Sequence, residues 1–444
     1  MTSDSSNYNS KRKLIITYHY SPEIDPRAFR WAAVAEYWGT KGYEIDVVSV
    51  WEPGLPNSEV LNKVNVYRVR DNLAILKSFI KNREGNKSPR YDWSKIPNKP
   101  LARLSPRVIY ENSLKKLQWP DFSFLWYFSA LKKAQELIRT AEYDGIISVS
   151  VPFTGHLVGL SLKKKFPQIP WLVDIGDPFS WLDSSPPNNL TLYKSLNYSV
   201  EGEVFEYADA ITVTTKLTQE KYIQFFPKLT KKIQVIPPLA SPSLVCKNIN
   251  WFFSLPEKIR FVFIGSLYKD TRDPDFLLRL FKRLQQTHVR DKLELHFFGR
   301  MNDYLEQVEE YRPLLNSKIF IHGLVTHSES KQVMQEADIL VNIGNENPSQ
   351  LPSKVVEYIS TGKPVLNLAK INEDSSAEFF SQYPAALSLF DSEEAFSSDT
   401  LHQLIQFIEH PPQVDEETLE RLCKPFQVEA IATAYEVIFQ RLSS

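Results

Sequence analysis

The chain has 444 residues, which is long for one hydrophobic core, so we expect two domains. Its formal net charge of −1 provides no basic field for nucleic acid, and we expect no nucleic-acid partner. Only two cysteines occur, Cys246 and Cys423, which argues against a disulfide framework or a cysteine-based zinc site and favours a reducing compartment.

The beginning of the chain carries no recognisable targeting segment. Residues 1–13 are polar and lack the apolar centre of a signal peptide. No run in the sequence approaches the roughly 20 apolar residues of a spanning helix. We therefore expect a cytoplasmic protein.

Short apolar runs alternate with helix signals through the first half. The expected strands cover residues 14–18, 45–50, 64–69, 146–149, 171–175 and 210–213. Between the first two, Asp25 is placed to cap a helix, Pro26 suits its first position and Gly42 ends it. Such alternation predicts a parallel sheet with helices on both faces.

The same alternation restarts near residue 259. The expected strands cover residues 259–264, 293–298, 319–322, 339–341 and 365–368. Asp273 and Pro274 again read as a cap and a first-turn proline, so we reject the Asp-x-Asp metal motif that they form with Asp275 and expect no metal. The sequence therefore predicts two successive doubly wound, Rossmann-like α/β domains.

The domain limits follow from these patterns. We expect a first domain over 1–240, a second over 241–425, and a final segment, 426–444, whose helix returns to the first domain. The proline-rich segment 237–242 is the expected hinge.

One segment interrupts the order of the first domain. Residues 77–116 contain eleven Lys or Arg against three Asp or Glu, with aromatic residues between them. Two interpretations stay open: a solvated insertion, or a patch that approaches an anionic membrane surface.

The most informative stretch covers residues 351–366. Pro352 suits a first helical position, while Gly362 and Pro364 end the helix. A polar loop after a strand, followed by a helix N-terminus, is a ready anion site. Glu357 lies about one and a half turns further in, where it can reach a ribose diol. A phosphate seat beside a diol acceptor indicates a nucleoside diphosphate-sugar; a buried helix with Glu357 on its solvated side is the alternative.

This stretch resembles the donor-site helix of GT-B glycosyltransferases of family 4. The family pattern is a Glu, seven residues and a second Glu, followed by a Gly-Lys/Arg-Pro-Val turn. Glu357 matches the second Glu, but Ser349 stands at the first, which leaves the sugar and turnover itself open. The resemblance implies a donor site formed by this helix and its preceding loop, including Ser349, Gln350, Ser353, Lys354 and Glu357.

Two motifs of the first domain extend the resemblance. Residues 151–157 follow a strand end and resemble the family's Pro-Pro-Phe-x-x-His segment, which implies that His156 contacts the transferred sugar. Residues 174–179 resemble an Asp-x-x-Asp-Pro-Trp segment, so Asp177 is placed to orient an acceptor hydroxyl. The alternatives are a packed histidine for His156 and turn capping for Asp177; for Asp174 capping is favoured.

Several cations complete the expected site. Arg27 and Arg30 lie three residues apart near a helix start, and they either hold acceptor or donor phosphate or pair with nearby carboxylates. Residues 265–272 loosely resemble the family's Gly-Arg-Leu…Lys-Gly loop, with a serine, Ser266, in place of the Arg. The resemblance then implies that Lys269 and Arg272 neutralise the leaving diphosphate. Arg300 ends a strand beside the expected nucleotide.

The resemblance implies a GT-B fold, in which the two domains face a central cleft, and a retaining, metal-independent glycosyltransferase without a cofactor. The donor would be a nucleoside diphosphate-sugar. The acceptor would be a glycan or lipid-linked saccharide in surface-polysaccharide assembly, at the inner face of the membrane. Two alternatives stay open: a non-catalytic nucleotide-sugar-binding scaffold, motivated by Ser349 and Ser266, and a GT-B-shaped sugar-nucleotide epimerase.

Overall fold

The computed structural model describes residues 11–23, 25–71, 117–182, 186–240, 253, 257–267, 272–301, 304–345, 351 and 353–443. These residues form two compact units, and the boundary between the units falls between Pro237 and Pro238. The last segment, Val428–Ser444, belongs to unit 1 although it follows unit 2 in the sequence. Each unit is described by itself, and the cleft between them stays a prediction.

Unit 1 is an α/β sandwich around a mostly parallel sheet. Its described elements are β1 (Arg12–Ile16), α1 (Pro26–Thr40), β2 (Glu44–Val50), β3 (Ser58–Leu61), β4 (Val64–Val69), α4 (Trp126–Thr140), β5 (Gly145–Val149), α5 (Thr154–Lys165), β6 (Trp171–Asp174), α6 (Leu190–Tyr207), β7 (Ala210–Val213), α7 (Lys216–Phe225), β8 (Ile233–Val235) and α15 (Val428–Ser443). Among these strands the sheet order is β3-β4-β2-β1-β5-β6-β7-β8.

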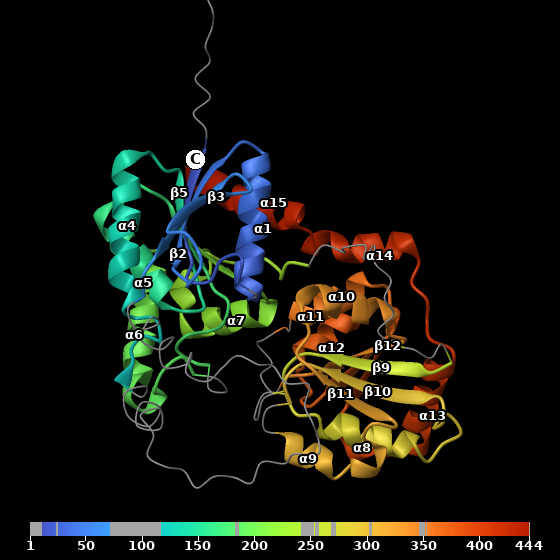
Figure 1. Cartoon of the computed structure of the whole chain (residues 1–444). Helices are drawn as coiled ribbons and strands as arrows, with labels where there is room; N and C mark the ends of the chain where they lie inside the picture. Colours follow the sequence, from blue (N-terminus) through green and yellow to red (C-terminus); the bar gives the residue numbers. More distant parts are fainter. Residues whose placement is uncertain are drawn as a thin grey trace, which may run out of the picture. The chain divides into compact units, whose positions relative to one another are not determined.

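Helices cover both faces of this sheet, as the continuous apolar strands require. On one face, α4, α5 and α6 pack through a core that contains Trp126, Val158 and Phe205. On the other face α1 packs beside α15, with the Trp31 and Tyr435 ring centres 4.9 Å apart. Figure 1 shows α4 and α5 on one side of the sheet and α1 on the other. The last helix therefore completes the sandwich of unit 1.

One edge of this sheet differs from the expected all-parallel arrangement. Strand β3 pairs antiparallel with β4, so the two form a hairpin. The turn residues Asn62 and Lys63 have φ angles of 48° and 71°, which suits the right-handed twist of a two-residue hairpin. Because β3 is short and partly exposed, its apolar signal is too weak to predict from the sequence.

Unit 2 repeats the doubly wound plan. Its described elements are β9 (Ile259–Ile264), α8 (Asp275–Leu284), β10 (Leu293–Phe298), α9 (Leu305–Glu309), β11 (Ile319–Gly323), α10 (His327–Glu336), β12 (Ile339–Ile343), α11 (Ser353–Ser360), β13 (Val365–Ala369), α12 (Ser375–Phe380), β14 (Ala386–Phe390), α13 (Ser398–Glu409) and α14 (Glu416–Cys423). Among these strands the order is β11-β10-β9-β12-β13-β14, and every pairing is parallel.

Two separate apolar cores lie on the two faces of this second sheet. The larger one packs α8 and α13 against the strands through residues such as Phe281 and Leu404. The smaller one packs α10 and α11 through Met334, Val355 and Ile359. Figure 1 shows these two helix groups on opposite sides of the sheet. The expected fold class, two doubly wound parallel-sheet domains, is therefore confirmed.

The local helix signals agree closely with the observed ends. Asp25 caps α1, and its Oδ1 accepts hydrogen bonds from the backbone N–H groups of Arg27 and Ala28. Helix α11 ends before Gly362, which has a φ of 70°. Helix α8 starts at Asp275, one residue later than expected, while Asp273 Oδ1 accepts from the Asp275 N–H at 2.9 Å. Asp273 thus serves this helix start from outside it.

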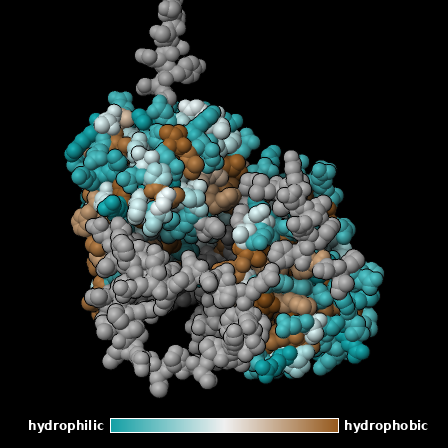
Figure 2. All heavy atoms as spheres, viewed as in Figure 1, coloured by the Kyte–Doolittle hydropathy of each residue, from teal (hydrophilic) through white to brown (hydrophobic). Residues whose placement is uncertain are grey.

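The described helices use their apolar sides in packing. None of them is long and apolar enough to cross a membrane. Figure 2 shows that hydrophilic side chains cover much of the described surface in view, with smaller apolar patches between them.

Candidate functional site

The carboxyl edge of the unit 1 sheet holds a buried carboxylate at the end of β6. Asp174 is 1% exposed. Its Oδ2 accepts hydrogen bonds from Arg27 Nη1 at 3.1 Å and from Trp31 Nε1 at 2.9 Å. Its Oδ1 accepts from Thr212 Oγ1 at 2.7 Å and from the Tyr435 hydroxyl at 2.8 Å. Asp174 thus joins α1, β7 and α15, rather than capping the following turn as expected.

Electrostatics keep this carboxylate charged. Burial by itself raises the pKa of Asp174, but Arg27 and Arg30, with two side-chain hydrogen bonds, bring the pKa below its ordinary value. The group therefore stays ionised at neutral pH as the counter-charge of two arginines.

Arg27 lies across the start of the 176–179 loop. Besides Asp174, its guanidinium donates from Nη2 to the carbonyl oxygen of Ile175 at 2.9 Å. The loop approaches so closely that a Cβ on Gly176 would lie 2.5 Å from Arg27 Nε and 2.7 Å from the Ser150 carbonyl oxygen. Arg27 pairs with a distant carboxylate, not with Glu23 or Asp25, and its side chain remains 15% exposed. A phosphate contact by Arg27 stays a prediction.

Arg30 lies deeper than Arg27. It is 3% exposed, and its Nη2 donates to the Tyr435 hydroxyl at 2.9 Å and to the Ile236 carbonyl oxygen at 3.3 Å. Its Nη1 donates to the Pro237 carbonyl oxygen. These contacts hold α15 and the end of unit 1 against α1. The observed contacts of Arg30 stabilise the fold of unit 1, and its expected contact with the acceptor stays a prediction.

His156 lies in the first turn of α5, at the end of β5. It is 1% exposed, and its Nδ1 lies 2.8 Å from Ser148 Oγ, which also accepts from Trp171 Nε1 at 2.9 Å. Burial lowers the pKa of His156 to about 3; Asp174 raises it and Arg27 lowers it further. The ring is therefore neutral at physiological pH. If the Ser148 hydroxyl donates to Nδ1, the ring proton is on Nε2.

The other ring nitrogen of His156 gives the strongest geometric hint in unit 1. Nε2 is buried and has no hydrogen-bond partner among the described residues. Buried polar atoms are almost always paired, so an unpaired one needs an explanation, and a bound ligand that completes it is one such explanation. The sequence resemblance and this unpaired nitrogen agree on His156, although its contact with a sugar stays a prediction.

Asp177 belongs to a half-buried loop. Glu201 on α6 accepts hydrogen bonds from the backbone of this loop. Glu201 is 1% exposed and accepts from the N–H groups of Phe179 and Ser180 at 3.3 Å each and from the Tyr222 hydroxyl at 2.7 Å. Burial raises the pKa of Glu201, and these hydrogen bonds oppose that rise. Glu201 could not be predicted from the sequence, because a lone glutamate in a helix has no signature.

A second missed carboxylate occupies the start of α5. Asp121 Oδ2 accepts from the Thr154 N–H at 2.9 Å, and its Oδ1 accepts from Thr154 Oγ1 at 2.8 Å. Asp121 also accepts from the Ser123 N–H at 2.9 Å. The Asp121 carboxylate therefore occupies the anion-binding position at the N-terminus of α5. The Asp-x-Ser spelling of an Asx turn was the available signal.

At the carboxyl edge of the unit 2 sheet, backbone segments at the ends of neighbouring strands approach one another closely. The Gly299 N–H donates to the Gly323 carbonyl oxygen at 2.7 Å, and the Gly265 N–H donates to the Phe298 carbonyl oxygen at 2.8 Å. A Cβ on Gly299, whose φ is 134°, would lie 2.0 Å from the Gly265 carbonyl oxygen. Only glycine fits there, so the backbones at the ends of β9, β10 and β11 lie close together beside the exposed Arg300.

Arg272 and Glu357 lie around one buried tyrosine at this edge. Tyr358 accepts from the Ile264 N–H at 3.2 Å, which ties α11 to the end of β9. Burial raises the pKa of Tyr358; Arg272 lowers it and Glu357 raises it further. Arg272 also donates from Nη2 to Asn345 Oδ1 at 3.0 Å. Arg272 therefore lies beside the ends of β9 and β12, and Glu357 belongs to α11, which Tyr358 ties to the end of β9.

Glu357 is held by its own helix. Its Oε2 lies 2.7 Å from Lys354 Nζ, and Lys354 also reaches Ser330 Oγ at 3.4 Å. The Lys354 and Glu357 side chains remain 25% and 13% exposed. Glu357 is therefore oriented yet open to a further hydrogen-bond donor. Lys269, Ser349 and Gln350 lie outside the described residues, as does the insertion 77–116, and the Ser353 side chain is not described.

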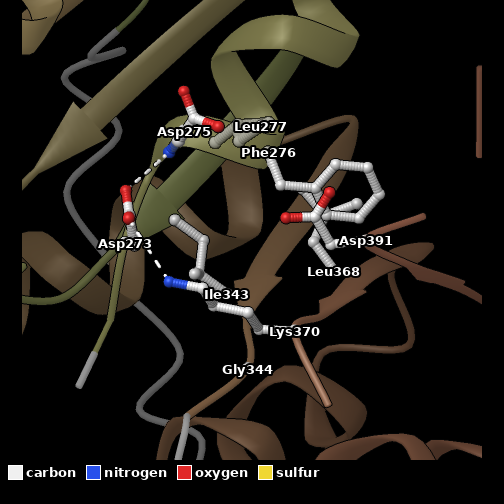
Figure 3. A pocket seen from close by; sticks show the side chains of 9 residues that line it. All are labelled: Asp273, Asp275, Phe276, Leu277, Ile343, Gly344, Leu368, Lys370 and Asp391. Atoms are coloured by element: carbon white, nitrogen blue, oxygen red, sulfur yellow. Dashed lines mark hydrogen bonds and ion pairs between the residues drawn. The ribbon is translucent and has the colours of Figure 1, made fainter. Parts of the chain in front are cut away.

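A small pocket opens next to Arg272 at the same edge. It encloses about 100 Å³ between the start of α8 and the ends of β12, β13 and β14. Figure 3 shows Asp273 and Lys370 pointing toward one another across it, 3.4 Å apart. Asp275 and Asp391 are both bound by Arg279, at 2.6 and 2.7 Å. Among the described residues no group of three or more His, Cys, Asp or Glu is arranged to hold a metal ion.

Comparison with known proteins identifies a family match in unit 2. Residues 258–376, most of the unit 2 sheet, match the family described as glycosyl transferases group 1. No curated protein matches the chain.

Solved structures match the whole fold. Sucrose-phosphate synthase from Thermosynechococcus elongatus has a TM-score of 0.63 at 15% identity, covering 97% of this chain and 99% of that one. HepE from Anabaena, solved in complex with UDP-glucose, has a TM-score of 0.59 at 13% identity, with 97% and 99% covered. WaaG, a glycosyltransferase involved in lipopolysaccharide biosynthesis, has a TM-score of 0.55 at 11% identity, with 96% and 99% covered.

These similarities agree with the two sheets described above. At these identities the solved structures establish the fold, while the match over residues 258–376 concerns the edge that carries Arg272 and Glu357. The chain has the GT-B fold, and its resemblance to GT-B glycosyltransferases is confirmed.

Proposed function

We propose that this protein is a retaining glycosyltransferase that moves a sugar from a nucleoside diphosphate-sugar to a glycan or lipid-linked saccharide. The observation that carries the proposal is that Arg272, beside Gly265 at the end of β9, and the oriented, partly exposed Glu357 of α11 both lie inside the segment that matches the group 1 family. A nucleotide sugar as donor is supported by the similar Anabaena structure, which is in complex with UDP-glucose.

In this proposal unit 2 binds the donor. Glu357 accepts hydrogen bonds from the ribose hydroxyls, and the glycines near Arg300 let the backbone approach the base. Arg272, Lys269 and the start of α11 stabilise the negative charge that develops on the leaving diphosphate. Because these groups supply the positive charge, the reaction needs no metal ion. The loop with Ser349 and Gln350 contacts the sugar.

Unit 1 supplies the groups at the reacting sugar. The neutral His156 donates from Nε2 to a hydroxyl of the transferred sugar, which would give this buried nitrogen its missing partner. Asp177 orients the acceptor hydroxyl. The acceptor enters on the face that the diphosphate leaves, and a leaving phosphate oxygen takes its proton, so the anomeric configuration is retained.

The basic insertion would bring the protein to its acceptor. An excess of eight positive charges over residues 77–116 is attracted to anionic lipid, at about 1 kcal/mol for each charge near the surface. We propose that it holds a cytoplasmic enzyme at the inner face of the membrane during surface-polysaccharide assembly. Reversing the charges of Lys87, Arg90, Lys95 and Lys99 should reduce sedimentation with anionic vesicles; equal sedimentation of both proteins would exclude the membrane role.

A two-stage assay tests the enzymatic proposal. UDP-, ADP-, GDP- and dTDP-sugars are first screened by thermal shift, and release of the nucleoside diphosphate from the best ligand is then measured with and without saccharide acceptors, in the presence of EDTA. Release that depends on acceptor supports a transferase. Binding without release supports a scaffold instead, and conversion of the donor sugar without acceptor supports an epimerase.

His156→Ala separates the two units in this assay. We expect the variant to bind the nucleotide as the wild type does but to lose most turnover, because His156 belongs to unit 1 and the nucleotide to unit 2. Lys132→Met, an exposed change on the same unit, should keep full turnover. Normal turnover of His156→Ala would return His156 to a packing role.

A further inference from the structure

A pocket of about 360 Å³ lies at the amino edge of the unit 1 sheet, the edge away from His156 and Asp174. Lys11 and Lys13 approach it from the start of β1, and Glu436 and Phe439 from α15. Its volume falls in the range of small-molecule sites. Nothing in the proposed transfer reaction uses this pocket, so the charged and aromatic residues that line it need their own explanation.

The buried amine of Lys13 is the unusual feature of this pocket. Lys13 is 4% exposed, and its Nζ lies 3.9 Å from the centre of the Phe439 ring. Within the described part of the chain it has no ion pair or hydrogen bond to an acidic side chain. Burying an ammonium group without a counter-charge is unfavourable, and a ring face compensates only part of that.

The nearby carboxylates have other partners. Asp144 Oδ2 accepts from the Arg12 N–H at 2.7 Å, and Glu436 is hydrogen-bonded to the Tyr43 hydroxyl. Burial lowers the pKa of Lys13 to about 8; Asp144 and Glu436 raise it, and the neighbouring charge of Lys11 lowers it further. Both carboxylates thus face the pocket with other partners, and among the described residues neither forms an ion pair with Lys13.

Aromatic rings form the apolar side of the pocket. The Trp38 and Tyr43 rings are stacked with centres 6.1 Å apart at 27°, and Lys11 Nζ lies 5.8 Å from the Tyr43 ring centre. Trp38 is fully buried behind Tyr43, which is partly exposed, so a flat apolar body can lie against the Tyr43 ring while its charge meets the two amines. Because Asp144 and Glu436 also face the pocket, a ligand with several negative charges would be repelled, and one negative charge fits best.

We propose that this pocket binds a small planar monoanion, an aromatic carboxylate, with the carboxylate on the Lys13 and Lys11 amines and the ring against Tyr43. The site is distinct from the carboxyl-edge group and does not depend on the glycosyltransferase proposal. Binding supplies the negative charge that Lys13 lacks, so it should also restore a higher pKa to that amine.

Benzoate and its uncharged analogue benzamide test the proposal on the full chain. Calorimetric titration at pH 7 should show saturable benzoate binding at least tenfold tighter than benzamide binding. The affinity for benzoate should fall as the pH rises above about 8, because the free amine then loses its proton before the anion binds. NMR of lysine labelled with ¹³C at Cε should show a Lys13 pKa that rises when benzoate is added.

Matched variants assign the effect to the pocket. Lys13→Met should reduce benzoate affinity at least tenfold, whereas Lys132→Met, which removes an exposed lysine from the same unit, should not change it. The proposal is overturned if wild-type protein shows no saturable binding up to 10 mM benzoate, if benzamide binds equally well, or if a folded Lys13→Met binds like wild type. If Lys13→Met does not fold, the contrast between benzoate and benzamide and its pH dependence decide alone.

Discussion

At the carboxyl edge of each unit a carboxylate pairs with a basic side chain, but the two pairs differ in how deeply they are buried. In unit 1, Asp174 is fully buried and receives bonds from three structural elements, and Arg30 is buried beside it. In unit 2, the Lys354–Glu357 pair lies on a single helix and both side chains keep some exposure. The first arrangement resists change, whereas the second leaves polar groups open to a ligand. The comparison separates residues that hold the fold from residues that can bind.

The largest effect is expected for Asp174→Asn. The amide has nearly the same size but cannot balance Arg27 and Arg30, and breaking a buried ion pair costs about 3–5 kcal/mol. Unfolding in urea followed by tryptophan fluorescence reports mainly on unit 1, because Trp251 alone of the nine tryptophans follows residue 237. The exposed Glu142→Gln on the same unit should change the free energy of unfolding by less than about 0.5 kcal/mol. Equal small effects of both variants would remove the distinction between the two edges.

The next effect concerns the pH dependence of unit 1 stability. The folded-state pKa of His156, about 3, lies below the unfolded value of about 6.5. As the pH falls from 6.5 toward 3, the unfolded chain therefore gains a proton that the folded chain does not, and stability falls by up to about 1.4 kcal/mol for each pH unit. Asp174, whose pKa is lowered, contributes in a lower window and loses its contribution below about pH 4.

His156→Gln should flatten this dependence between pH 6.5 and 4.5. The same fluorescence measurement in urea, repeated at several pH values, gives the slope for variant and wild type. An unchanged slope would show that His156 is accessible to protons in the folded protein.

The smallest effect is expected for Lys354→Met in unit 2. A partly exposed pair three residues apart on a helix contributes about 0.2–0.5 kcal/mol. Amide hydrogen exchange in α11 and β9 should therefore change little. A loss above about 2 kcal/mol would mean that this pair holds the fold as Asp174 does, and the comparison between the edges would fail.

Local patterns predicted much of the fold. Strands β4, β7, β9 and β10 begin and end at the expected residues, because each is a short apolar run bounded by polar or glycine residues. The cap at Asp25 and the helix end near Gly362 follow from backbone requirements that act within a few residues. The weak edge strand β3 was missed for the opposite reason, since its residues are half-exposed and its pairing depends on a turn.

The site was predicted only where a local motif exists. His156 and Glu357 were proposed as site residues through short segments that resemble family 4, and their roles stay predictions. The partners of Asp174 were not, because Tyr435 lies 261 residues away and Thr212 lies 38 residues away. Arg30 shows the same limit: the sequence suggested a ligand contact, and its observed partners lie on segments that only the fold brings near.

The central claim is that unit 2 binds a nucleoside diphosphate through Glu357, and calorimetric titration of the full chain with UDP, ADP, GDP and dTDP tests it most directly. For the nucleotide that binds, Glu357→Gln should weaken binding by about 1.5–3 kcal/mol, the range for a hydrogen bond to a charged group. The exposed Glu417→Gln on the same unit is the control and should bind like wild type. Unchanged affinity of a folded Glu357→Gln, or no binding of any of these nucleotides to the wild type, would contradict the account.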